Sequence, residues 1–173
     1  MASQHYYSVF LLSLLLLPLV YAVEGDTSYG DAEEKVEVVV EGVVSCQSCE
    51  AHGTWSLDGA EPIKAAKVSV ICKNHKDNIS YYKVFPTDDK GYFYAQLDEF
   101  KMNNNILDHP LHSCRVHLVS SPLPTCNHLT NINYGIDGAP LRYNNKRLFG
   151  ENYEAVIYSV GPFAFRPAQC YKN

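Results

Sequence analysis

The sequence predicts an all-β domain, a disulfide-stapled antiparallel β-sandwich or barrel of about six to seven strands. Three observations support this fold class. Seven short runs rich in Val, Ile, Tyr and Phe are separated by residues typical of turns. No segment repeats apolar residues with the spacing of an amphipathic helix. Six cysteines lie beyond the first apolar segment, an even number that is typical of disulfide-linked secreted domains.

The first 22 residues are predicted to be a secretory signal peptide. Residues 9–20 are almost entirely apolar and end near Val20-Tyr21-Ala22, which resembles a small-residue cleavage site. The run is too short to cross a bilayer, which needs about 20 apolar residues. An anchor that is never cleaved is the alternative. After cleavage we expect no membrane association.

Charge divides the rest of the chain into a leader and a body. The net charge is −5. Acidic residues gather just after the signal segment, so residues 23–35 are predicted to be an acidic flexible leader and residues 36–173 the β domain. From Val38 onward acids and bases balance. A body without excess positive charge argues against nucleic-acid binding and allows an uncharged partner.

Each expected strand follows from its local pattern. Residues 36–44 are β-branched, residues 66–72 and 114–119 alternate, and residues 79–85 end at Pro86. The turn at 87–91 leads into residues 91–97. The last two expected strands are residues 153–160 and a short edge at 162–167. The polar segments 103–112 and 122–143 are predicted to be surface loops.

Alternation also places two cysteines. Cys72 and Cys114 point inward on two expected strands, so a bridge between those strands is geometrically easy. Six cysteines allow 15 pairings, and spacing alone does not choose among them. The Cys46-x-x-Cys49 motif is also found in zinc and redox sites, but no second metal-binding pair and no helical pattern accompany it. Structural disulfides are therefore favoured.

Three stretches resemble a known family. They are EGVVSCQSC (residues 41–49), TDDKGYF (87–93) and GPFAFRP (161–167), the last followed by Cys170. Together they resemble the plant pollen Ole e I allergen and extensin family. The resemblance is greatest to the cysteine-containing C-terminal domain of chimeric arabinogalactan and proline-rich cell-wall proteins, and it covers about residues 36–171.

The resemblance implies both a disulfide pattern and a function. Carried over by cysteine order, the pairs are Cys46–Cys126, Cys49–Cys170 and Cys72–Cys114. The implied function is that of a secreted, non-catalytic protein of the cell wall and extracellular matrix. Its implied partners are wall polysaccharides or glycoprotein glycans such as galactan and arabinogalactan. An extracellular protein-binding module or receptor ligand, with contacts through loops such as 103–112, is the alternative, and self-association stays open.

Catalytic and metal sites are not predicted. The chain lacks the common motifs of hydrolases, nucleotide-binding proteins and metalloproteases. Asp98, Glu99 and Asp108 are the carboxylates considered for a glycosidase pair, but solvated loop charges are the commoner case. His109, His112 and His117 form the densest histidine cluster, and nothing completes a metal site there. We therefore expect no cofactor.

Three aromatic residues and one asparagine are the candidate sites. Trp55, Tyr92 and Tyr94 are predicted glycan contacts, because aromatic faces stack on sugar rings. If Phe93 points into the core, Tyr92 and Tyr94 form an exposed pair on the other face of the strand. Asn78-Ile79-Ser80 is an N-glycosylation sequon in a turn-like stretch.

Overall fold

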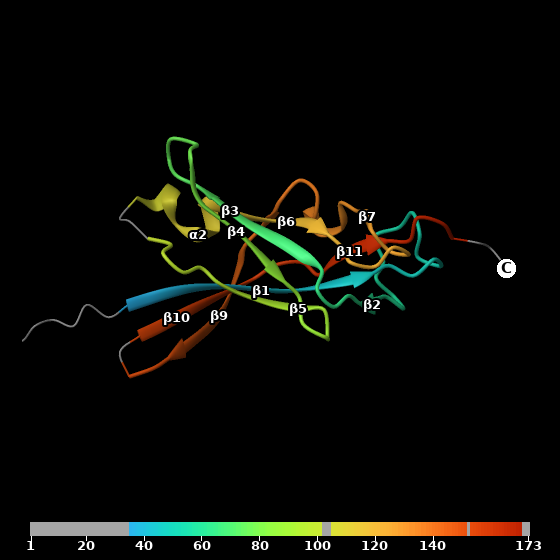
Figure 1. The fold of residues 1–173 in the computed structure, drawn as a ribbon. Coiled ribbons are helices and arrows are strands. Elements are labelled where there is room, and N and C mark those ends of the chain that lie inside the picture. The colour runs from blue at the N-terminus through green and yellow to red at the C-terminus, as the bar shows by residue number, and fades with distance from the viewer. Residues whose placement is uncertain (1–34, 102–104, 152, 171–173) are drawn as a thin grey trace, which may run out of the picture. The chain divides into compact units, whose positions relative to one another are not determined.

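Two β-sheets pack against each other across one apolar core (Figure 1). The computed structural model describes residues 35–101, 105–151 and 153–170. The predicted signal peptide and leader residues 23–34 lie outside the described residues. The strands and helices of the described ranges lie between Lys35 and Arg166.

The larger sheet is built around β1 (Lys35–Cys46). Along one edge β1 pairs antiparallel with β5 (Tyr92–Gln96) and β2 (Glu61–Pro62). Along its other edge it pairs parallel with β10 (Tyr153–Ser159) and β11 (Phe163–Arg166). Two outer strands complete the sheet: β9 (Arg142–Phe149) beside β10 and β7 (His128–Leu129) beside β11.

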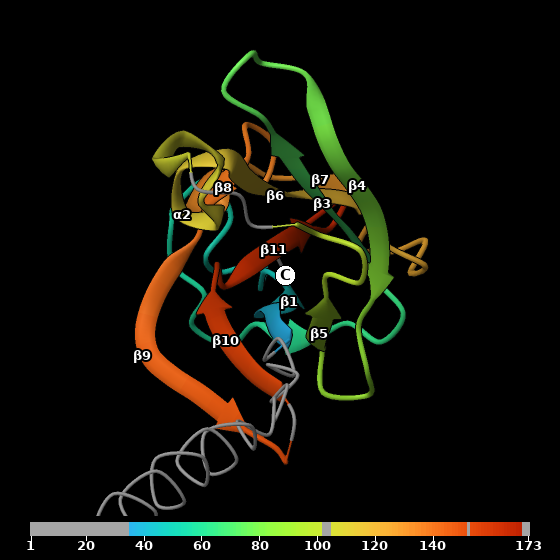
Figure 2. The ribbon, with the colours of Figure 1, turned by 90° about the vertical axis from the view of Figure 1, so that its left-hand side faces the viewer.

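The smaller sheet is antiparallel throughout and has the order β4-β3-β6-β8. Its strands are β3 (Lys67–Lys73), β4 (Ile79–Pro86), β6 (Cys114–Ser120) and β8 (Ala139–Pro140). Figure 2 shows the short helix α2 (Pro110–Ser113) close to this sheet. Two 3₁₀ segments, η2 (Ile106–Asp108) and η3 (Ile132–Tyr134), lie in the connections on either side of β6. No helix of the described residues is long and apolar enough to cross a membrane.

The predicted fold class is confirmed as a disulfide-linked β-sandwich, and each of the seven expected strands is present. Two pairings differ from the antiparallel expectation, because β1 runs parallel to β10 and β11. Residues 162–167 were expected to form an edge, but β11 lies between β1 and β7, with Phe163 and Phe165 fully buried.

The predicted loops hold more structure than expected. Residues 122–143 contain β7, η3 and β8, and residues 103–112 contain η2 and most of α2. β9 was not predicted. Its side chains are almost all exposed, so its sequence lacks the apolar alternation by which a strand is recognised.

The core follows from alternation in both sheets. Val38, Val40 and Val44 of β1 point inward and are at most 3% exposed. They pack in one cluster with residues of β3, β5 and β6 such as Val70 and Phe93. Burying side chains of this size contributes about 1.5–3 kcal/mol each. The register of β1 therefore also decides which of its side chains face solvent.

Three disulfides join Cys46 to Cys126, Cys49 to Cys170 and Cys72 to Cys114, the same pairs that the resemblance implies. The last pair lies directly opposite in the β3–β6 register and is fully buried. The first two link the carboxyl end of β1 to the chain before β7 and after β11. Closing loops of this length contributes about 2–4 kcal/mol per bridge.

The turn before β5 requires glycine. Gly91 has φ +71°, and its N–H donates to the Asp88 carbonyl. The Asp88 side chain accepts from the N–H groups of Lys90 and Tyr92. A Cβ at Gly91 would lie 2.4 Å from the Val44 carbonyl oxygen. Gly53 also has a positive φ, of +82°, but a Cβ there meets nothing within 4 Å.

This pair of glycines gives a matched test. We expect Gly91→Ala to lower the free energy of unfolding by about 3 kcal/mol, because left-handed strain adds to a backbone clash. Gly53→Ala carries the strain alone and is expected to cost about 1 kcal/mol. Urea denaturation of the oxidised proteins measures both. Equal losses would contradict the clash at Gly91.

Candidate functional site

The outward side of the larger sheet carries a connected set of tyrosines and charged side chains. Register places Tyr94 opposite Glu41 and Gln96 opposite Val39, and on the parallel edge Val39 lies opposite Ile157. Directly paired residues share a face of the sheet. Because Val38, Val40 and Phe93 face the core, these residues face away from it. We call this surface the tyrosine face; it comprises Glu37, Glu41, Tyr92, Tyr94, Gln96, Lys146 and Tyr153.

Glu41 is the centre of the hydrogen-bond network on the tyrosine face. The Tyr92 hydroxyl donates to Glu41 Oε2 at 2.6 Å. Lys146 Nζ donates to both carboxylate oxygens, at 2.9 and 2.8 Å. The Glu41 side chain is only 16% exposed, whereas that of Lys146 is 52% exposed. The carboxylate is thus held in place from two strands, with its charge balanced.

The pKa values follow from this network. Burial acts to raise the pKa of Glu41, but the hydrogen bonds from Lys146 and Tyr92 outweigh it, so the pKa lies below the ordinary value. Burial and the bond to Glu41 raise the pKa of Tyr92. Burial also raises the pKa of Tyr94, with nearby Glu41 adding to the effect. Both phenols therefore keep their protons at neutral pH.

Tyr94 is the more open of the two predicted tyrosines. Its side chain is 45% exposed, while Tyr92 is half-buried with its hydroxyl committed to Glu41. Beside them, the Gln96 amide donates to Glu37 Oε2 at 2.6 Å. Phe93 is 1% exposed, so the condition for an outward tyrosine pair is met.

A small aliphatic cluster lies on the same side of the sheet. Val39, Ala155 and Ile157 are each at most 3% exposed and form a cluster separate from the main core. The tyrosine face therefore combines exposed aromatic rings with fixed hydrogen-bond donors and acceptors. This combination suits ligands that have both an apolar surface and hydroxyl groups, as sugar rings do.

Trp55 belongs to a different surface. It is 72% exposed and lines a pocket of about 330 Å³ with residues of β7, η3 and β11, such as Leu129 and Arg166. The loop that carries it is held by Gln47, which is 2% exposed. Its amide donates to the carbonyls of Ala51, Thr54 and Ser56. Neither Tyr92 nor Tyr94 lines this pocket.

Asn78 lies in the turn between β3 and β4 and is exposed. Its backbone N–H donates to Asn74 Oδ1, and its carbonyl accepts from the Asn74 N–H, so both the side chain and the backbone of Asn74 fix the turn. The sequon asparagine is thus exposed on a tight turn.

Most of the histidines and carboxylates considered from sequence contact neighbouring groups of the protein. The His109 and His112 rings lie 6.4 Å apart, while His117 contacts the Ile136 carbonyl. Asp108 is buried against His75, and Asp98 pairs with Lys83. Within the described residues no group of three His, Cys, Asp or Glu side chains is arranged to hold a metal ion.

Sequence reasoning found Tyr92 and Tyr94 but missed Glu41, Gln96, Lys146 and Tyr153. Glu37 and Glu41 are an even number of residues apart, so in a strand they lie on the same face. This spacing indicates that the two carboxylates share one surface. Lys146 has none, because it lies in a polar segment 105 residues from Glu41.

Comparison with known proteins gives sequence relatives and one fold neighbour. No protein-family profile matches the chain. It is 34% identical to non-classical arabinogalactan protein 30 of Arabidopsis thaliana, over 77% of this chain and 54% of that protein. It is 32% identical to a pistil-specific extensin-like protein of Nicotiana tabacum, over 78% of this chain and 32% of that protein. The chain thus spans about half the length, or less, of these curated relatives.

A crystal structure of the major plantain pollen allergen Pla l 1 has the same fold. The TM-score is 0.51 at 19% identity, over 79% of this chain and 98% of that one. The predicted resemblance to arabinogalactan, proline-rich and extensin-like plant proteins is borne out by these sequence relatives, and the allergen structure shows the shared fold. A shorter relative, the seed and root hair protective protein of Arabidopsis thaliana, is 28% identical over 84% of its length. None of these names is that of an enzyme.

The Glu41 network is tested by removing its cation. We expect Lys146→Met to raise the pKa of Glu41, because burial stays while one of the two hydrogen-bonding partners is lost. A pH titration of the Glu41 carboxyl carbon by NMR measures this shift. In the wild type, the lowered pKa contributes stability above the unfolded-state pKa, and this is lost as the pH falls through the folded-state value. Lys64→Met, at the exposed pair with Asp89, is the control and leaves Glu41 unchanged.

The sequon is tested by expression in a secreting plant or yeast cell. We expect one N-linked glycan at Asn78, seen as a mobility shift on enzymatic deglycosylation. Asn78→Gln and Ser80→Ala should abolish the shift, while Ser80→Thr keeps the sequon and the shift. A shift that persists in Asn78→Gln would contradict the assignment.

Proposed function

We propose that this chain is a secreted, non-catalytic cell-wall protein that binds wall polysaccharide or arabinogalactan-type glycans through the tyrosine face. The observation that carries the proposal is the exposed Tyr94 ring beside the Tyr92–Glu41–Lys146 network. The ring offers a stacking surface, and the network offers oriented donors and acceptors for hydroxyl groups.

The charges of the tyrosine face favour a neutral glycan. Glu41 is balanced by Lys146, and Glu37 accepts from the uncharged Gln96 amide. A face whose strongest ion pair is internal has little attraction for a charged ligand. Galactan, arabinan and arabinogalactan side chains are neutral or nearly so, and we propose them as ligands.

The setting of the protein is inferred from two further observations. Three disulfides and no free cysteine among the described residues are typical of an oxidising, extracellular compartment. The relatives bear the names of arabinogalactan, proline-rich and extensin-like proteins of plants. Both support a role in organising the wall matrix.

A glycan array tests the proposal. The oxidised domain is applied to immobilised galactan, arabinan and arabinogalactan, beside a reduced and alkylated sample. We expect fold-dependent retention, and about tenfold weaker binding for Tyr94→Ala, because burying an aromatic ring contributes about 1.5–3 kcal/mol. Tyr82→Ala is the matched control, since Tyr82 is 60% exposed on β4 of the other sheet.

Two further variants assign the contacts. Tyr92→Phe removes the hydroxyl bond to Glu41 and keeps the ring, which separates stacking from the network. Trp55→Ala tests the second predicted surface, where we expect a smaller loss. Absence of retention on any wall glycan would overturn the proposal, and capture of a receptor ectodomain by the same sample would favour the protein-binding alternative.

A further inference from the structure

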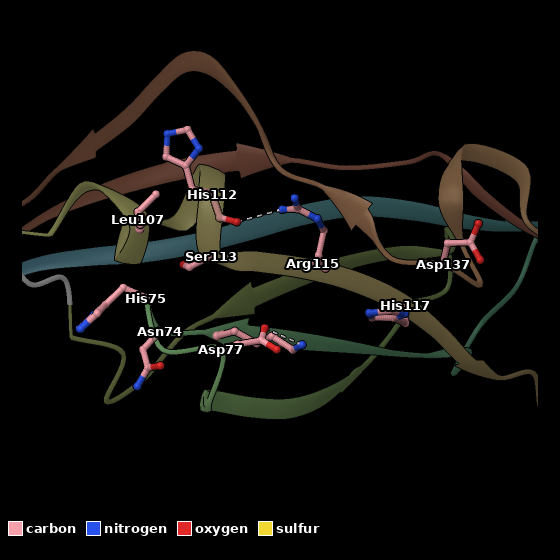
Figure 3. A pocket seen from close by; sticks show the side chains of 10 residues that line it. Asn74, His75, Asp77, Leu107, His112, Ser113, Arg115, His117 and Asp137 are labelled. Atoms are coloured by element: carbon pink, nitrogen blue, oxygen red, sulfur yellow. Dashed lines mark hydrogen bonds and ion pairs between the residues drawn. The ribbon is translucent and has the colours of Figure 1, made fainter.

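We propose that a pocket on the outward side of the smaller sheet is a second site, which binds a sugar carrying a carboxylate and binds it more tightly at acid pH. The pocket has a volume of about 510 Å³ and is lined by residues of β3, the β3–β4 turn, α2 and β6 (Figure 3). It goes beyond the proposed function, because both the surface and the ligand class differ.

Arg115 is the fixed cation of this pocket. Its Nη1 donates to the carbonyls of His112 and Cys114, at 3.3 and 2.8 Å, and Figure 3 shows the guanidinium directed toward α2. Among the described residues, Nη2 and Nε donate to no protein group. A half-buried guanidinium held at one nitrogen keeps the rest of its fork for an anion, and carboxylates suit that geometry.

His117 is held in one orientation beside Arg115. The neighbour of its Nδ1, at 3.0 Å, is the Ile136 carbonyl, which only accepts, so Nδ1 carries the proton. Gly138 allows this placement: a Cβ there would lie 2.6 Å from the ring Cε1. Nε2 is therefore left to accept when the ring is neutral and to donate when it is charged.

The other charged groups around the pocket determine the sign of its net charge. Lys73 pairs with Asp77 at 2.9 Å, and Asp137 accepts from Asn131. His75 Nδ1 lies 3.1 Å from the buried Asp108. The fixed charges are thus two cations against three carboxylates, which is −1 in total. The titratable groups are His75, His112 and His117.

Acidification therefore makes the pocket more favourable for an anion. Histidine is the side chain whose charge changes between pH 8 and pH 5. Three histidines line the pocket, so any proton that they gain on acidification makes its formal charge more positive. A uronate carboxylate keeps its own charge at pH 5, so attraction grows on acidification. On the tyrosine face, the internally balanced Glu41–Lys146 pair provides no such change.

The ligand class follows from the size and the other donors of the pocket. A volume of this size accommodates more than one sugar ring. Asn74 uses its Oδ1 to accept from Lys76 and Asn78, which leaves its amide N–H groups for ligand hydroxyls. The Arg115 cation, the amide donors of Asn74 and the open shape of the pocket together point to a short stretch of an acidic polysaccharide.

Calorimetric titration with trigalacturonic acid tests the site. The oxidised protein is titrated at pH 5 and pH 8 at one ionic strength, beside the methyl-esterified trimer and a neutral galactose trimer. We expect at least about tenfold tighter binding of the acid at pH 5 than at pH 8, and loss of that preference for the ester, because the hydrogen bonds to a charged group are the stronger ones. A phosphorylated sugar in a further arm separates carboxylate recognition from general anion binding.

Variants assign the residues. Arg115→Gln should weaken binding at pH 5 by about tenfold or more. His117→Asn keeps a donor for the Ile136 carbonyl but removes the titratable nitrogen, so it should reduce the ratio of the affinities at the two pH values. Arg166→Gln is the matched arginine control, because Arg166 lines the separate pocket that contains Trp55. Thermal melts of each variant show whether it is folded.

NMR of the histidine rings gives a measurement that would not change if His117 had only a structural role. By linkage, saturating ligand should shift the titration of the His117 ring to higher pH. Equal affinity at both pH values, equal binding of the ester, or an equal loss in Arg166→Gln would overturn the proposal. Tyr94→Ala should leave uronate binding unchanged and Arg115→Gln should leave galactan binding unchanged, so failure of either site is distinguishable.

Discussion

The structure depends on the pairing of β1 along both of its edges. Four strands bond directly to it: β2 and β5 on one side, β10 and β11 on the other. A strand buried between neighbours has its backbone groups satisfied by them, so its register is fixed. A slip of one residue would turn Glu37 and Glu41 into the core and Val38 and Val40 out of it. The same constraint therefore builds the core and places the carboxylates of the tyrosine face.

The carboxyl end of β1 is linked by disulfides to the segment before β7 and to the segment after β11. Two of the three disulfides leave from Cys46 and Cys49, and Gln47 between them bonds to three carbonyls of the following loop. An exposed Trp55 on a loop with so many constraints loses little conformational freedom when a ligand stacks on it. The Thr87–Gly91 turn likewise restricts Tyr92, because the Asp88 side chain accepts a hydrogen bond from the Tyr92 N–H.

The elements that local pattern predicts are those whose side chains alternate. β3 and β6 were predicted with the right inward residues. The outward direction of Tyr92 and Tyr94 was predicted on the condition that Phe93 is buried, and Phe93 is 1% exposed. The parallel pairing of β1 with β10 was not, because parallel strands need no turn that a sequence could reveal. β9 was missed because it is a polar edge strand. Its Lys146 reaches Glu41 only through that pairing, so the network of the tyrosine face is a product of topology rather than of any motif.

The two outward faces differ in how their charges are balanced, and this difference has a consequence for how a wall protein works. Each sheet turns its inner side to the shared core, so the tyrosine face and the Arg115 pocket point away from each other. One short glycan cannot reach both, so under the two proposals simultaneous binding would join separate polymers or distant parts of one. A second contact made by a protein already held on one polymer benefits from its high local concentration, and weak affinity at each face is then enough for firm attachment. Under the two proposals, acidification would strengthen the link to the acidic polymer through the Arg115 pocket, while the Glu41–Lys146 pair would leave the link to the neutral polymer unchanged.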